Sequence, residues 1–122
     1  MVTVSFEVKE YRIYLPRSGK ANISGFKKTV KYRGVINCFG EHNHQDYCFQ
    51  IFFLASGKVP SPRYDYENKV GVMFLLIKDM PIFVDVLRNE KPVYANLNSK
   101  YPEDNGLLVR MEPVGEGEIA PP

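Results

Sequence analysis

The chain of 122 residues contains no tryptophan, only two cysteines and only two histidines. It also lacks any stretch near the ~20 apolar residues that a membrane-spanning helix needs, so we expect no contact with a membrane. The first ten residues, MVTVSFEVKE, do not have the basic and apolar regions of a secretory signal peptide. We therefore expect a cytoplasmic protein, in which a structural disulfide is not favoured.

Motifs that bind nucleotide phosphates are missing as well. The sequence contains neither Gly-x4-Gly-Lys-Ser/Thr nor Gly-x-Gly-x2-Gly, and its RSGK and ASGK segments have the composition of turns. The acidic residues are scattered, without the local spacing of a catalytic pair. Both cysteines belong to apolar segments, where burial raises the pKa of a thiol and makes it a poor nucleophile. The sequence thus favours a non-enzymatic protein, and we expect no cofactor.

The length and composition indicate one globular domain. Hydrophobic residues make up 44% of the chain and charged residues 25%, which argues against general disorder. We predict a single β-rich domain over residues 1–114. Residues 115–122, GEGEIAPP, have little to bury, and we predict a mobile acidic and proline-containing tail.

Alternation and apolar runs predict about six strands. The first of them alternates Val4 and Phe6 with polar neighbours, whereas YCFQIFFLA and VGVMFLLIK are almost continuously apolar and are expected to be buried centrally. Asn105-Gly106 predicts the turn of a terminal hairpin, and residues 21–23 have the character of a short edge pairing. The predicted strands cover residues 2–14, 26–39, 47–55, 70–78, 93–98 and 107–114.

One short amphipathic helix is predicted over residues 80–89. Asp79 has the side chain of an N-cap, and Pro81 suits the first turn of a helix. Asn89 tolerates the left-handed conformation that often ends a helix, and Pro92 prevents its continuation. We expect the apolar face to pack on a sheet with Phe83 as its main anchor; this face comprises Ile82, Phe83, Val86 and Leu87.

These elements predict a mainly β (α+β) fold, with the helix placed before a C-terminal hairpin. Two architectures fit the pattern. One is a single curved antiparallel sheet that embraces the helix, and the other is a partly open, OB-like barrel.

All cysteines and histidines lie in CFGEHNHQDYC, residues 38–48. If the hairpin is centred on Asn43, Cys38 faces Cys48 across the two strands. Each cysteine is then roughly 13 Å from its nearer histidine, at ~3.3 Å per extended residue. A site for zinc would require the loop to curl back over the cysteines. We predict two reduced, adjacent thiols without a metal, and we keep a disulfide and a four-ligand site as alternatives, the latter formed by Cys38, His42, His44 and Cys48.

Basic residues concentrate in the first third of the chain. Residues 1–34 contain eight lysines and arginines against two glutamates, whereas the remainder of the chain is net acidic. Several of these cations alternate with tyrosines, as in proteins that hold single-stranded nucleic acid; equally, basic and acidic faces can neutralise each other within the fold. The candidate nucleic-acid-binding residues are Lys27, Lys28, Lys31, Tyr32, Arg33, Arg63, Tyr64 and Tyr66.

Taken together, these patterns favour a binding module. The preferred partner is another protein or a second copy of the chain, engaged through an exposed edge strand or an aromatic patch. Binding of single-stranded nucleic acid is the alternative, and metal binding by the cysteine–histidine segment is the second alternative.

Overall fold

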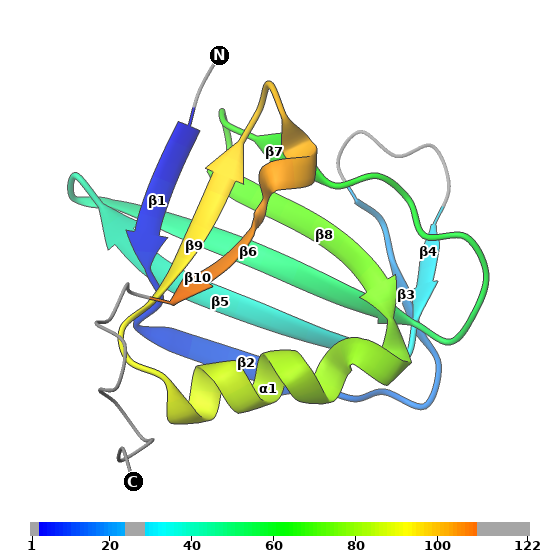
Figure 1. Ribbon diagram of the computed structural model, residues 1–122. Helices are drawn as coiled ribbons and strands as arrows, with labels where there is room; N and C mark the ends of the chain where they lie inside the picture. Colours follow the sequence, from blue (N-terminus) through cyan, green and yellow to red (C-terminus); the bar gives the residue numbers. More distant parts are fainter. Residues whose placement is uncertain (1–2, 24–28, 110–122) are drawn as a thin grey trace, which may run out of the picture.

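The computed structural model describes residues 3–23 and 29–109 (Figure 1). Within these ranges the chain forms ten strands, one α-helix and two short 3-10 helices, which confirms a mainly β protein with one short helix. The helical elements are η1 (Ile77–Asp79), α1 (Met80–Asn89) and η2 (Pro102–Asp104). The strands are β1 (Thr3–Glu7), β2 (Glu10–Tyr14), β3 (Gly19–Ala21), β4 (Val30–Tyr32), β5 (Gly34–His42), β6 (Gln45–Leu54), β7 (Arg63–Asp65), β8 (Val70–Leu76), β9 (Val93–Asn98) and β10 (Gly106–Val109).

The described strands form three sheets and no closed barrel. Their orders are β2-β5-β6-β8-β7, β1-β9-β10 and β3-β4. The prediction of one antiparallel sheet is therefore wrong. It also fails within the largest sheet, because β6 and β8 run parallel. Residues 55–69 return the chain to the start of β8 and contribute β7, without the crossover helix that usually joins parallel neighbours.

The predicted first strand, residues 2–14, is divided between two sheets. The chain turns at Val8 and Lys9: the amide of Val8 donates to the carbonyl of Val93 (2.8 Å), and the amide of Lys9 donates to the carbonyl of Phe39 (2.9 Å). β1 thus joins β9, whereas β2 joins β5. The backbones approach so closely at this corner that a Cβ atom on Gly40 would clash with the carbonyl oxygen of Glu7.

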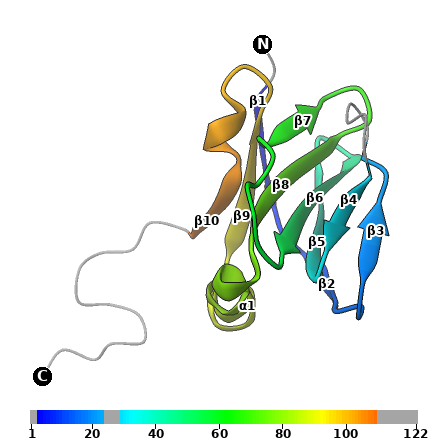
Figure 2. The ribbon, with the colours of Figure 1, turned by 90° about the vertical axis from the view of Figure 1, so that its right-hand side faces the viewer.

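The five-stranded sheet is covered on both faces (Figure 2). On one face lie the β1-β9-β10 sheet and α1, and on the other lies the β3-β4 hairpin. The first core contains Phe6, Ile36, Phe49, Ile51, Phe53 and Leu97, and the second contains Ile23, Val30, Val35, Phe52, Val72 and Phe74. Burial of β6 on both faces explains its nearly continuous apolar sequence.

The helix α1 spans the predicted residues, but its two ends are not capped as predicted. Because η1 leads directly into α1, Asp79 has a helical backbone and caps no amide with its side chain; its carboxylate lies 3.2 Å from Nζ of Lys78 instead. Asn89 remains helical, and the extended Glu90 is the C-cap. In the described part of the chain, neither α1 nor any other helix has the length and apolar character needed to cross a bilayer.

The packed face of α1 is also rotated relative to the prediction. The buried side chains are Met80 and Leu87, whereas Ile82 is 65% exposed. Phe83 is half-buried and makes an edge-to-face contact with Phe53, with 5.8 Å between ring centroids.

β9 and β10 are antiparallel neighbours, as predicted, but Asn105-Gly106 does not form their turn. Asn105 has a φ of −64° and is only 5% exposed. Its side chain accepts a hydrogen bond from the amide of Asn98 (2.7 Å) and donates one to the carbonyl of Arg63 (3.2 Å). Asn105 therefore connects the loop between β9 and β10 to β7. The rest of the predicted last strand, 110–114, and the predicted tail, 115–122, lie outside the described residues.

Candidate functional site

The cysteine–histidine segment forms the β5-β6 hairpin with a two-residue turn. Asn43 (φ 52°) and His44 (φ 63°) are both left-handed, which is the geometry that matches the twist of adjoining strands. The pairing of His42 with Gln45 closes the turn, so the hairpin is centred between Asn43 and His44. The predicted centre on Asn43 is half a residue away from the true one.

This shift separates the two cysteines. Cys38 is paired with Phe49, and Phe39 with Cys48, so the thiols lie on opposite faces of the sheet. The prediction that Cys38 and Cys48 face each other is therefore wrong. Both are free thiols, and burial raises the pKa of Cys38 to about 12, with the charge of Cys48 as a lesser cause. Burial likewise raises the pKa of Cys48 to about 11, so neither thiol is activated as a nucleophile.

The histidines do not join the cysteines. His42 is exposed near the end of β5, and its ring meets that of Tyr47 edge-on, with 6.2 Å between centroids. His44 is exposed in the turn itself. Among residues 3–23 and 29–109, no group of three or more histidine, cysteine or acidic side chains is placed to hold a metal ion.

The candidate nucleic-acid-binding residues differ in their exposure. Lys31 and Arg33 are exposed, but Tyr32 packs edge-on against Phe52, with 5.1 Å between centroids. Lys27 and Lys28 lie outside the described residues. Lys31 and Arg33 are therefore accessible, but the ring of Tyr32 between them packs against Phe52 and is not free to stack on a base.

The second group of these candidates lies on and beside β7. Arg63 is exposed, but Tyr64 is buried, and burial together with a hydrogen bond to Tyr47 raises its pKa to about 12. Tyr64 cannot stack on a base, which corrects the sequence prediction for this residue. Tyr66, at 52% exposed, has an accessible ring.

A different feature stands out at the opposite edge of the five-stranded sheet. β2 is the terminal strand there, and all five of its residues are exposed. Tyr11 (37%), Ile13 (37%) and Tyr14 (52%) leave large apolar surfaces in solvent, and Leu15 (65%) continues the series. Edge strands of this kind offer unpaired amide and carbonyl groups to another chain. The other edge, β7, has only three residues and is already engaged by Asn105.

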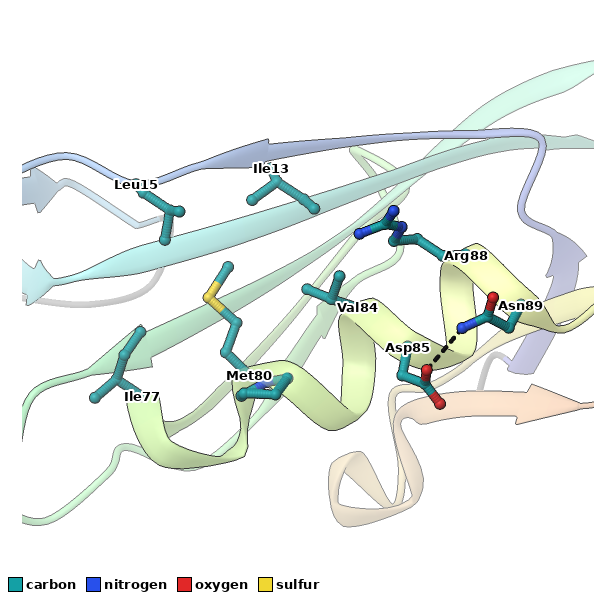
Figure 3. Close-up of a pocket in the computed structure, with 9 residues that line it drawn as sticks. Ile13, Leu15, Ile77, Met80, Val84, Asp85, Arg88 and Asn89 are labelled. Atoms are coloured by element: carbon teal, nitrogen blue, oxygen red, sulfur yellow. Dashed lines mark hydrogen bonds between the residues drawn. The ribbon is translucent and has the colours of Figure 1, made fainter.

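The β2 edge borders an apolar groove (Figure 3). Tyr11 and Ile13 lie in register with Cys38 and Ile36, which places them on the face of the sheet that carries α1. The groove between this edge and α1 has a volume of about 640 Å³. Its lining residues are Ile13, Leu15, Ile77, Met80, Pro81, Val84, Asp85, Arg88 and Asn89.

A second, smaller cavity lies toward the start of β2. Its volume is about 300 Å³, and it is lined by Tyr11, by Leu87 of α1 and by Glu90, which follows the helix. Ile13 and Leu15 thus line the groove and Tyr11 lines the smaller cavity, with residues of α1 opposite in both. Figure 1 shows α1 running alongside β2.

Charged groups of the groove are arranged asymmetrically. Arg88 points toward β2, whereas Asp85 points away from it, and the Asp85 carboxylate accepts a hydrogen bond from Nδ2 of Asn89 (2.6 Å; Figure 3). Within the described ranges, the Arg88 guanidinium has no hydrogen bond or ion pair. The groove therefore combines an apolar floor with one cation, Arg88, that pairs with none of the described residues.

Sequence reasoning did not single out this site. Residues 11–14 are predicted only as the end of a half-buried strand and as part of a basic, tyrosine-containing segment, since nothing local reveals that this strand lies at an edge. The chain matches no protein-family profile, no curated protein and no solved structure. Only the geometry of the molecule therefore indicates a function for this chain.

Proposed function

We propose that this chain is a non-enzymatic interaction module that binds one extended segment of a partner protein along β2. The observation that carries the proposal is the coincidence of an exposed edge strand with an apolar groove beside it. Main-chain hydrogen bonds to an edge strand supply affinity, and pockets for alternate side chains supply specificity. Both requirements are met along Tyr11, Ile13 and Leu15.

The position of α1 favours a single strand over a second sheet. α1 runs alongside β2 (Figure 1), and its residues form the far wall of the groove (Figure 3). A second copy that paired through its own β2 would place a second α1 on the same face of the joined sheet, across the common edge from the first. One extended segment requires only the space between β2 and α1.

Peptide selection tests the proposal. We expect phage-displayed ten-residue peptides to be enriched on the full chain and to lose binding to Ile13→Asp, which puts a carboxylate on the groove wall. Leu108→Asp is the matched control, because Leu108 is 50% exposed on β10, away from β2. Both variants should unfold within about 0.5 kcal/mol of the wild type, as is usual for surface changes.

A backbone scan distinguishes strand addition from side-chain binding alone. Methylation of the amide nitrogens of an enriched peptide, one at a time, should weaken binding at every second position, because only alternate amides face β2. Absence of enriched peptides, or equal loss with Ile13→Asp and Leu108→Asp, would overturn the proposal. Concentration-dependent dimers in sedimentation that disappear with Ile13→Asp would instead identify a second copy as the occupant.

A further inference from the structure

We infer that the preferred segment has two aliphatic residues and one acidic residue at alternate positions, in the order aliphatic-x-aliphatic-x-Asp/Glu. This inference deepens the proposed function and depends on it. It is carried by the spacing of Met80, Val84 and Arg88 along the wall of the groove and by the charge of Arg88, which pairs with no residue in 3–23 or 29–109.

The first two positions face apolar side chains. Around Leu15 the groove is lined by Ile77 and Met80, and around Ile13 by Val84. Met80 is a flexible side chain that adapts to different aliphatic groups. Its sulfur lies close to the site of Gly34, where an added Cβ would be 2.8 Å from Sδ. The sheet therefore leaves room for Met80 because Gly34 has no side chain.

The third position faces a cation. Arg88 points toward β2, and no described residue pairs with its guanidinium. Asp85, the acidic residue of the same groove, is directed away and is occupied by Asn89. A carboxylate is the complementary group for a guanidinium, which it can contact through two parallel hydrogen bonds.

The spacing of the three positions follows from helix and strand geometry. Met80, Val84 and Arg88 are four residues apart, which is a rise of about 6 Å for each interval along a helix. Alternate residues of a strand are about 6.7 Å apart. One face of an extended segment therefore meets these three side chains in succession.

The direction of the segment follows from the strand it joins. Leu15 and Met80 lie at one end of the groove, and Tyr11 and the C-terminal end of α1 lie at the other. Antiparallel pairing is the more stable arrangement for each residue. A segment antiparallel to β2 passes Met80 first and Arg88 last, which gives the stated order.

Selections on matched variants test this inference. We expect random ten-residue peptides selected on the wild type to show the aliphatic-x-aliphatic-x-acid pattern. Selection on Arg88→Glu should replace the acid by Lys or Arg. Lys58→Glu, a charge reversal of an exposed lysine between β6 and β7, should keep the acid.

Titration of a fluorescein-labelled enriched peptide measures how much the acidic residue contributes to affinity. Exchange of its acid for the neutral amide should weaken binding to the wild type by about fivefold, a modest effect because Arg88 is exposed. The same exchange should not weaken binding to Arg88→Glu. Thermal unfolding of all variants confirms that the comparison is made on folded protein.

The outcomes separate this inference from the function on which it rests. If no peptide is enriched on any variant, the proposed function fails. The inferred specificity is wrong if the enriched peptides lack an acid, have the reverse order, or keep the acid on Arg88→Glu. The proposed function as a peptide-binding module would still be supported in each of these cases. Displacement of the labelled peptide by a synthetic RMEPVGEGEIAPP, the sequence of residues 110–122, would assign the groove to the chain's own segment and overturn the partner.

Discussion

Cys38 and Cys48 lie on opposite faces of the five-stranded sheet, one residue away from the register that would pair them. The two-residue turn at Asn43 and His44 determines this offset, because it pairs His42 with Gln45. Since side chains alternate between faces, a shift of one residue moves a side chain across the sheet. The two cysteines are placed symmetrically in the sequence, yet their side chains lie on opposite faces of the sheet.

The first prediction concerns the chemical state of these thiols. We expect alkylation by iodoacetamide at pH 8.5 to find two thiols per chain in denaturant and much slower labelling of the native protein. Burial of Cys38 and the raised pKa values of both residues are the reason. Mass spectrometry of the labelled chain provides the measurement. A disulfide between them would contradict the register of β5 and β6.

The second prediction is that the protein loses stability at alkaline pH. Folding raises the pKa of Cys38 from 9.0 to about 12, so the folded state favours the neutral thiol. The resulting stabilisation is complete below pH 9 and is lost as the pH rises toward 12. Denaturant unfolding at pH 9 and pH 11 should show a loss that is smaller in Cys38→Ala by at least about 1 kcal/mol. An equal loss in both proteins would show that Cys38 is not the group responsible.

The third prediction concerns the β5-β6 turn. His44 has a φ of 63°, a conformation that glycine adopts without steric cost, so His44→Gly should raise the free energy of unfolding by about 0.5–1 kcal/mol. His42→Gly is the control, because His42 belongs to β5, where glycine costs about the same amount. Stabilisation by His44→Gly together with destabilisation by His42→Gly, measured by denaturant unfolding, would confirm the position of the turn. Destabilisation by both changes would place the turn elsewhere.

The bounds of the helix could be predicted because residues close in the sequence determine where it begins and ends. Pro81 marks the first turn and Pro92 prevents continuation, and α1 spans the predicted residues 80–89. The rotation of its packed face was missed, since η1 enters the helix directly and Met80 occupies the space above Gly34.

Partners distant in the sequence explain the remaining differences. The alternation of residues 2–14 indicates a strand but cannot show that the chain changes sheets at Val8. For the same reason, the sequence of β2 cannot show that it is an edge strand. β2 lies at the edge because β5 pairs with β2 on one side and with β6 on the other. The groove is thus a product of tertiary structure, although an exposed edge strand was among the predicted modes of binding.

The fourth prediction ranks the side chains of α1. Leu87→Ala should destabilise the protein by about 2–4 kcal/mol, because Leu87 is 9% exposed. Phe83→Ala should cost less, about 1–3 kcal/mol, since its half-buried ring keeps only part of its contacts in the core. Ile82→Ala, at a 65% exposed position, should change stability by less than about 0.5 kcal/mol. A larger effect at Ile82 than at Leu87 in denaturant unfolding would contradict the orientation of the helix.

The last prediction concerns Asn105, whose buried side chain joins two sheets. Asn105→Ala removes the acceptor for the amide of Asn98 and the donor to the carbonyl of Arg63, and leaves both backbone groups without these partners. We expect a loss of about 2–3 kcal/mol in denaturant unfolding, since an unsatisfied buried group costs about 1–3 kcal/mol. Asn105→Asp should retain the acceptor for Asn98 but lose the donor to Arg63 and bury a carboxylate, so it should also destabilise the protein at neutral pH. Hydrogen exchange should then show faster exchange at the amide of Asn98 in Asn105→Ala but not in Asn105→Asp. Equal protection of that amide in both variants would show that the bond to Asn98 does not hold the loop.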